Sequence, residues 1–180
     1  MDKLKYSLFD LFVYMVPGAF VLFSIYLSYH GHIGFQVIKN IMLELKDVNI
    51  FISVLFVVIA YCVGFITSTI GKYYLRLKEL IFPIKVNLVI AMSNSEKYSL
   101  IREKSKENFK YIEQWNVLKN FSANLACCVL LVSGILYAYV DNFTLPALLI
   151  GIAVSILLLI QSTKFNIWAM KDLDNAVRVC

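Results

Sequence analysis

The side chains best suited to chemistry in this sequence are two histidines and four cysteines. His30 and His32 flank Gly31, an arrangement that could hold a metal ion or respond to pH. No cluster of carboxylates or thiolates accompanies them, so we interpret both as polar residues at a membrane interface. We predict no metal site in this chain.

The cysteines are Cys62, Cys127, Cys128 and Cys180. They fall inside apolar stretches or near the last residue, where neither an oxidising solvent nor the spacing of metal ligands is available. We expect the adjacent pair Cys127 and Cys128 to be packing residues in an apolar helix.

Motifs for enzymatic chemistry are missing from the sequence. It has no glycine-rich phosphate loop, no GxSxG, no HExxH, no cysteines at metal spacing and no carboxylate pair in an apolar setting. We therefore predict no catalytic residues and no cofactor, and we expect a protein that is not an enzyme.

Four stretches without a formal charge determine the expected fold: residues 11–29, 49–71, 120–140 and 142–163. Each has the roughly 20 apolar residues that a helix needs to cross a bilayer. A soluble four-helix bundle is the alternative, but residues 50–66 show no polar face. We predict an all-α, multi-pass membrane protein with four transmembrane helices in a single domain, residues 1–180.

The distribution of Lys and Arg predicts the orientation. All of these residues except Lys39 and Lys46 precede the first span, lie between the second and third spans, or follow the fourth. Basic residues near the ends of spans are retained on the cytoplasmic side. We therefore expect both termini and the segment 72–119 to be cytoplasmic.

The segment 72–119 is the one sizeable water-facing region that the sequence predicts. Ser93 to Ser95 and Glu96 are suited to begin a helix, and no Pro or Gly occurs between Pro83 and Gly134. We expect one unbroken helix, about 40 residues long, to run from Ser95 into the third span.

One face of this expected helix is apolar and must pack on a neighbour, which is residues 72–92, a second copy or another protein. We predict that it docks a cytosolic effector through Tyr98, Arg102, Lys104, Lys106, Phe109, Lys110 and Trp115. Bases outnumber acids in this segment, but no nucleic-acid-binding module is recognisable and a basic surface is ordinary beside anionic lipids. We predict no direct nucleic-acid binding.

Small residues recur at every fourth position in two spans: Ala60, Gly64 and Ser68, and then Ala147, Gly151 and Ser155. Such faces allow close helix packing in lipid, within one chain or between copies. Because four helices bury little of their own surface, we expect a homo-oligomer.

The opening YSLFDLFVYMVPGAF, residues 6–20, resembles the start of small multi-pass proteins encoded beside bacterial antiphage systems. Length, topology and the basic inner segment are similar to the membrane subunit of the Kiwa defence system, and less closely to membrane accessory proteins of some RNA-targeting CRISPR loci. The resemblance implies an oligomer in the bacterial inner membrane that senses infection, or alters membrane permeability, together with a cytosolic partner.

Two hypotheses for the function remain open at this point. The first is an oligomeric membrane sensor or scaffold for antiviral defence that docks a cytosolic effector. The second is an oligomeric pore or membrane-permeabilising effector, in which a water-filled axis between copies is lined by Asn124, Ser133, Gln161 and Thr163. We favour the first, because the spans contain too few polar residues to line a water-filled pore along its whole length.

Overall fold

The structure, a computed structural model, describes residues 2–31, 35–44, 49–81 and 90–179. Six helices account for nearly all of these residues: α1 (Asp2–His30), α2 (Phe35–Glu44), α3 (Ile50–Ile81), α4 (Asn94–Lys104), α5 (Lys106–Tyr139) and α6 (Leu145–Val179). No strand occurs within the described ranges. The all-α prediction is confirmed.

Four helices are long and apolar enough to cross a membrane. The candidate spans are Phe12–His30, Ile50–Leu77, Lys106–Tyr139 and Leu145–Val179. Each contains one of the four charge-free stretches or most of it, so the predicted number of spans is confirmed. These four helices indicate a membrane protein.

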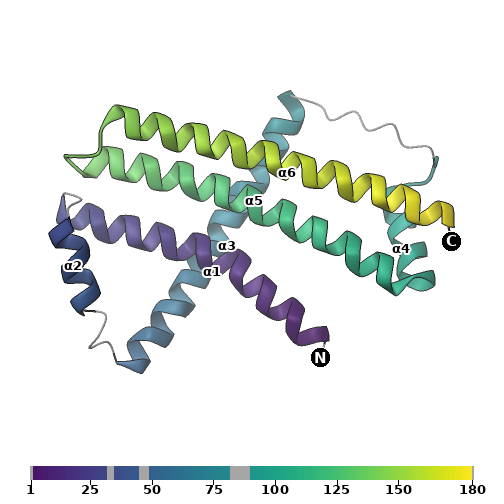
Figure 1. Cartoon of the computed structure of the whole chain (residues 1–180), viewed down its shortest axis with the longest axis horizontal. Helices are drawn as coiled ribbons and strands as arrows, with labels where there is room; N and C mark the ends of the chain where they lie inside the picture. Colours follow the sequence, from purple (N-terminus) through teal and green to yellow (C-terminus); the bar gives the residue numbers. More distant parts are fainter. Residues whose placement is uncertain (1, 32–34, 45–48, 82–89, 180) are drawn as a thin grey trace.

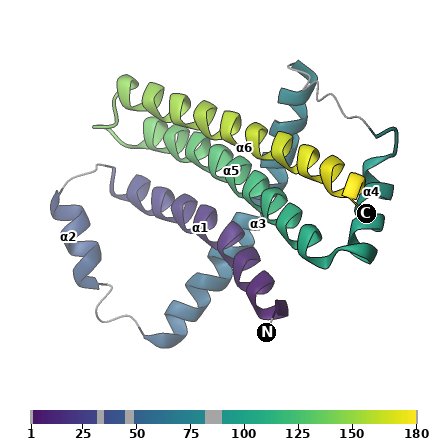
Figure 2. The same cartoon turned by 45° about the vertical axis from the view of Figure 1, so that its right-hand side comes forward.

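The long helices are arranged around α5, which packs against α1, α3 and α6. α5 and α6 lie side by side and antiparallel, whereas α3 crosses behind them at a steep angle (Figure 1; Figure 2). Both termini and α4 lie in the right-hand half of the molecule in Figure 1, and α2 lies at the left-hand end.

Glycines bring α1 and α3 into contact at their crossing. A Cβ atom on Gly18 would overlap the carbonyl oxygen of Ala60, and one on Gly64 would overlap the carbonyl oxygen of Tyr14. Ser68, on the same face of α3, is also buried. The small-residue face of α3 is therefore used within the chain, where it lets two backbones approach closely.

Small residues also join α5 and α6. A Cβ atom on Gly151 would lie 2.7 Å from Ser133 Cβ. The Ser155 hydroxyl donates to the carbonyl oxygen of Ala126 at 2.8 Å, and Ala147, one turn before Gly151, is half-buried. The second small-residue face is thus occupied within the same chain as well.

The connection between α5 and α6 is short and packs against the end of α1. α1 ends at His30 and is followed by Gly31, whose φ of 70° favours glycine. The Gly31 carbonyl accepts a hydrogen bond from the Asp141 N–H at 2.9 Å. Leu27, Leu136 and Val140 form a small core there. α5 and α6 thus form a tight antiparallel hairpin.

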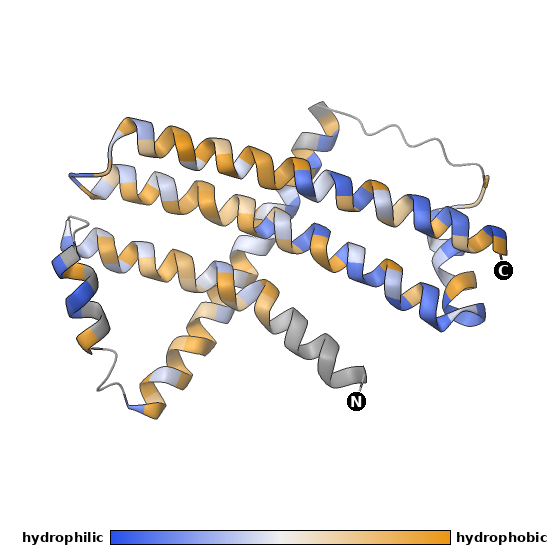
Figure 3. Ribbon diagram, in the orientation of Figure 1, coloured by the Kyte–Doolittle hydropathy of each residue, from blue (hydrophilic) through white to orange (hydrophobic). Residues whose placement is uncertain are grey.

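Hydropathy changes along α5 and α6. Their left-hand halves are mostly hydrophobic, and their right-hand halves, with α4, are largely hydrophilic (Figure 3). We call the hydrophilic part the head and define it as residues 90–119 and 164–179. The head joins segments that are far apart in the sequence.

Candidate functional site

The head begins with a capped helix. The Ser93 hydroxyl accepts a hydrogen bond from the Glu96 N–H at 3.3 Å, and the Glu96 carboxylate accepts one from the Ser93 N–H at 2.9 Å. This reciprocal capping box confirms the helix start predicted from Ser93 and Glu96. The hydrogen bond from the Ser93 backbone, and then that from its hydroxyl, lower the pKa of Glu96.

The predicted unbroken helix from Ser95 into the third span is wrong. α4 ends at Lys104, and Ser105 has φ −142° and ψ 88°, so the chain turns before α5 starts at Lys106. From Lys106 onward α5 does continue without a break into the apolar region. The break lets α4 fold back against α5 and α6, and this burial overrides the local preference for helix.

A small hydrophobic core explains why α4 folds back. Ile101 of α4, Ile112 of α5 and Leu173 of α6 are almost completely buried and contact one another. Tyr98 and Phe109 pack around them, with their ring centroids 6.4 Å apart. The apolar face that the sequence leaves without a partner is therefore covered by the second half of α6.

A buried ion pair joins α4 to α6. Lys97 Nζ lies 2.7 Å from Asp174 Oδ1, and both side chains are at most 5% exposed. The Ile90 N–H donates to the same oxygen at 3.3 Å, and Arg178 Nη2 lies 3.2 Å from Asp174 Oδ2. Two buried charges require this kind of pairing, because an unpaired one is costly outside water. Asp174 thus holds the start of the head, α4 and α6 together.

Aromatic rings connect α5 to α6 beside this core. Trp115 stacks on Phe165 with ring centroids 5.8 Å apart and meets the edge of Trp168 at 5.0 Å. Its indole N–H donates to Asp172 Oδ2 at 2.9 Å. Trp115 is therefore fixed inside the head by both stacking and a charged acceptor.

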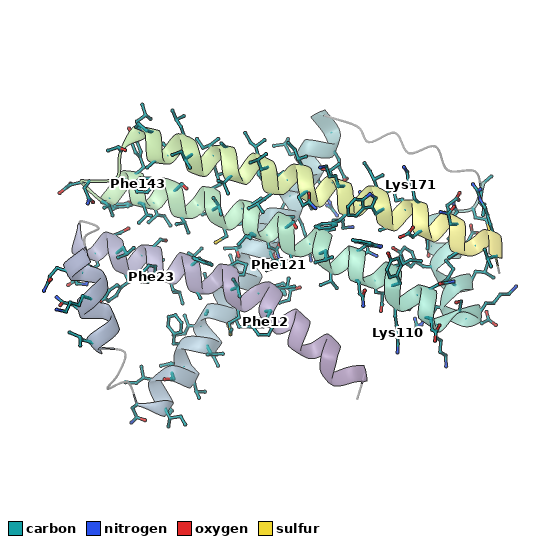
Figure 4. All side chains as sticks on the ribbon, viewed as in Figure 1. Phe12, Phe23, Lys110, Phe121, Phe143 and Lys171 are labelled. Carbon is teal, nitrogen blue, oxygen red and sulfur yellow. The ribbon has the colours of Figure 1, made fainter. Side chains whose placement is uncertain are left out.

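The predicted docking residues divide into two groups. Tyr98, Phe109 and Trp115 pack within the head, and the Tyr98 hydroxyl oxygen accepts a hydrogen bond from Asn116 Nδ2 at 2.6 Å. The basic members are exposed: Arg102, Lys104, Lys106 and Lys110. Figure 4 shows Lys110 pointing outward near the right-hand end of the molecule. Of the predicted docking residues, only the basic group is therefore exposed.

Two parts of the head were not predicted. The second half of α6 carried a usable signal, because Phe165, Ala169, Leu173 and Ala176 recur at helical spacing. Lys97 and Asp174 carried none, since each stands among other polar residues. Only the folded arrangement shows that they meet.

The part of the chain that the structure describes contains no group of three or more potential metal ligands among its His, Cys, Asp and Glu residues. His30 ends α1 and contacts the ring of Tyr26, with centroids 4.8 Å apart, while His32 and Cys180 lie outside the described residues. Cys127 and Cys128 are buried in α5, and Cys128 Sγ donates to the Pro17 carbonyl at 3.2 Å. Cys127 and Cys128 are thus packing residues, as predicted, whereas Cys62 is exposed.

Comparisons with known proteins assign this chain to no family. No protein-family model matches it, and no match is found among curated proteins or among solved structures.

Proposed function

We propose that this protein is a membrane scaffold whose head docks a water-soluble partner on the cytoplasmic side of a bacterial inner membrane. The buried pair of Lys97 and Asp174 is the observation that supports this most directly, because it fixes the head as one unit. At about 1.5 Å per residue, the head segments 106–119 and 164–179 project roughly 20 Å beyond the charge-free stretches, or charge-free windows, of α5 and α6. That is far enough to present a protein surface beyond the lipid head groups.

The exposed bases form the proposed contact. Arg102 and Lys104 are in the last turn of α4, and Lys106 and Lys110 are in the first turns of α5. Basic side chains at this end favour a partner with an acidic surface, since complementary charge steers encounter and selects partners. The resemblance to membrane subunits of antiphage systems makes a cytosolic defence effector the partner that we propose.

The pore alternative receives less support from the positions of its proposed lining. Asn124 is buried in α5 next to Gly71 of α3, and Ser133 is buried against Gly151 of α6. Both side chains face interfaces within one chain, and these positions do not support a water-filled axis between copies.

We retain the homo-oligomer as part of the proposal, with a different contact surface. The two small-residue faces are already occupied within the chain. A second copy would have to use another surface, such as residues 50–59 of α3, all of which are exposed.

The docking proposal is tested by charge reversal. The full chain carrying K104E, K106E and K110E is co-expressed with the products of the neighbouring genes and captured in mild detergent. Recovery of the partner should fall roughly tenfold or more, because the complementary charge has been inverted. Trp115→Ala is a poor test, since Trp115 packs inside the head.

K39E is the matched control, because Lys39 is exposed on α2 at the opposite end of the molecule. Capture by this variant should equal that of the unchanged protein. Unchanged recovery with the triple variant, or an equal loss with K39E, would contradict docking at the basic end of the head.

A further inference from the structure

A second polar site lies outside the proposed docking surface. It is a pocket of about 240 Å³ between α3, α5 and α6. Its lining includes Lys72, Arg76 and Glu79 of α3, Lys119 and Asn120 of α5, and Asn166 of α6. Residues of three helices thus converge on one small space.

The pocket lies where three helices change from apolar to charged. The charge-free window of α3 ends just before Lys72, that of α5 begins just after Lys119, and that of α6 ends at Thr163. All three residues line the pocket. In a membrane this level is the edge of the hydrocarbon core, where the phosphates of lipid head groups lie.

The lining carries an excess of positive charge. Three cationic side chains face one carboxylate, that of Glu79. Lys119 is half-buried; it makes a hydrogen bond to Asn116 Oδ1 at 3.4 Å and interacts electrostatically with the Glu79 carboxylate. No ion pair with Lys72 or Arg76 occurs among the described residues. Because three cationic side chains line the pocket beside one carboxylate, the remaining positive charge favours binding of an anion.

We propose that this pocket binds the head group of an anionic phospholipid. An arginine with two lysines suits a phosphate, and side-chain amides such as that of Asn120 suit the polar atoms beside it. The volume is below the roughly 300 to 1,000 Å³ of pockets for drug-sized ligands, and it suits a small polar group such as a lipid head group. Basic pockets between spans are typical sites for anionic lipid head groups.

The lipid would join parts of the protein that the chain leaves apart. α3 packs mainly on α1 and α5, whereas α6 packs on α5 and α4. A phosphate in the pocket would lie among residues of α3, α5 and α6 together. This inference depends on the position of the pocket in the membrane and not on partner docking at the head.

The test is native mass spectrometry of the full chain in detergent with phosphatidylglycerol, phosphatidylcholine or inorganic phosphate added. Phosphatidylglycerol should remain bound in preference to phosphatidylcholine, because only the first has a net negative head group. R76Q should weaken its retention roughly tenfold, and R76Q with K119Q should abolish it. K164Q is the matched control, because Lys164 is exposed at the same depth on α6 but does not line the pocket.

Three results would overturn the proposal: equal retention of phosphatidylcholine, an equal loss with K164Q, or binding of inorganic phosphate in place of the lipid. Arg76 is exposed, so R76Q alone decides the matter if the double variant fails to fold. The pocket variants should still capture the partner of the head, and the K104E, K106E and K110E variant should still retain lipid. The two proposals can therefore fail separately.

Discussion

α5 and α6 pack together in two regions, with different side chains in each. One is the head, and the other is the apolar region, residues 120–139 of α5 and 145–163 of α6. In the apolar region the contacts are small, as where Gly151 meets Ser133 and where Ser155 donates to the Ala126 carbonyl. In the head the same two helices bury Ile112 and Leu173 against each other and stack large rings. One pair of helices thus uses two kinds of packing.

The expected solvent explains the difference. In lipid, burying a large apolar side chain gains little, so helices associate through close approach and hydroxyl hydrogen bonds. In water, burial of large apolar side chains is itself the main driving force. The head also contains the buried pair of Lys97 and Asp174, whereas the charge-free windows contain no ionisable carboxylate or amine. Substitutions in each region should therefore act through different mechanisms.

Lys97→Ala should have the largest effect on stability. Removing the ammonium deprives the buried Asp174 carboxylate of the Lys97 partner at 2.7 Å, which costs about 3 to 5 kcal/mol. The loss should be confined to the head, with α4 detaching from α6. Hydrogen exchange measured by mass spectrometry in detergent should show faster exchange in α4 and unchanged exchange in the apolar part of α5.

Arg178→Ala is the control for this experiment. Its side chain is 47% exposed, so its ion pair with Asp174 should contribute less than about 1 kcal/mol. Replacing both Lys97 and Asp174 by Met and Leu should recover most of the stability, because both charges of the buried pair are then removed together. Equal effects of Lys97→Ala and Arg178→Ala would show that the buried pair does not distinguish the head from the apolar region.

Gly64→Ala should have the next largest effect, and it acts on the apolar region. The added methyl group overlaps the backbone carbonyl of Tyr14, and no side-chain rotation can relieve that overlap. We expect a loss of about 1 to 3 kcal/mol, measured as the fraction folded when a denaturing detergent is added to a mild one.

Gly134→Ala provides the matched control, because an added Cβ there has nothing within 4 Å. It should be neutral or slightly stabilising, since alanine favours helix. If Gly64→Ala behaves like Gly134→Ala, close backbone approach is not what joins α1 to α3.

The sequence was most informative where one physical requirement dominates. A span needs about 20 residues without charge, so the four long helices could be predicted from composition along the chain. The start of α4 was equally predictable, because the Ser93 and Glu96 capping box is a local pattern.

Long-range contacts explain what the sequence did not reveal. Ser105 breaks the expected helix although no Pro or Gly is near, because Ile101 gains burial against Leu173 only if α4 turns back. Trp115 was predicted to meet another protein, but its stacking partner Phe165 lies in the same chain. Helical periodicity identified an apolar face correctly, and it could not identify what covers that face.

The smallest expected effect concerns the start of α4 and its dependence on pH. Hydrogen bonds from Ser93 lower the pKa of Glu96 from its ordinary value of 4.5, so the folded state binds this proton less tightly than the unfolded state. The stabilisation is therefore complete above the ordinary pKa and is lost as the pH falls through the lowered folded value.

Glu96→Gln should remove this acid-dependent loss, because glutamine does not titrate. Hydrogen exchange in α4, compared between the unchanged protein and Glu96→Gln across the acid range, isolates this group from the other carboxylates of the head. Exchange in the apolar part of α5 should be the same in both proteins at every pH, since its packing uses no carboxylate. An identical pH response of α4 in the two proteins would mean that the cap, although formed, does not contribute to the stability of the head.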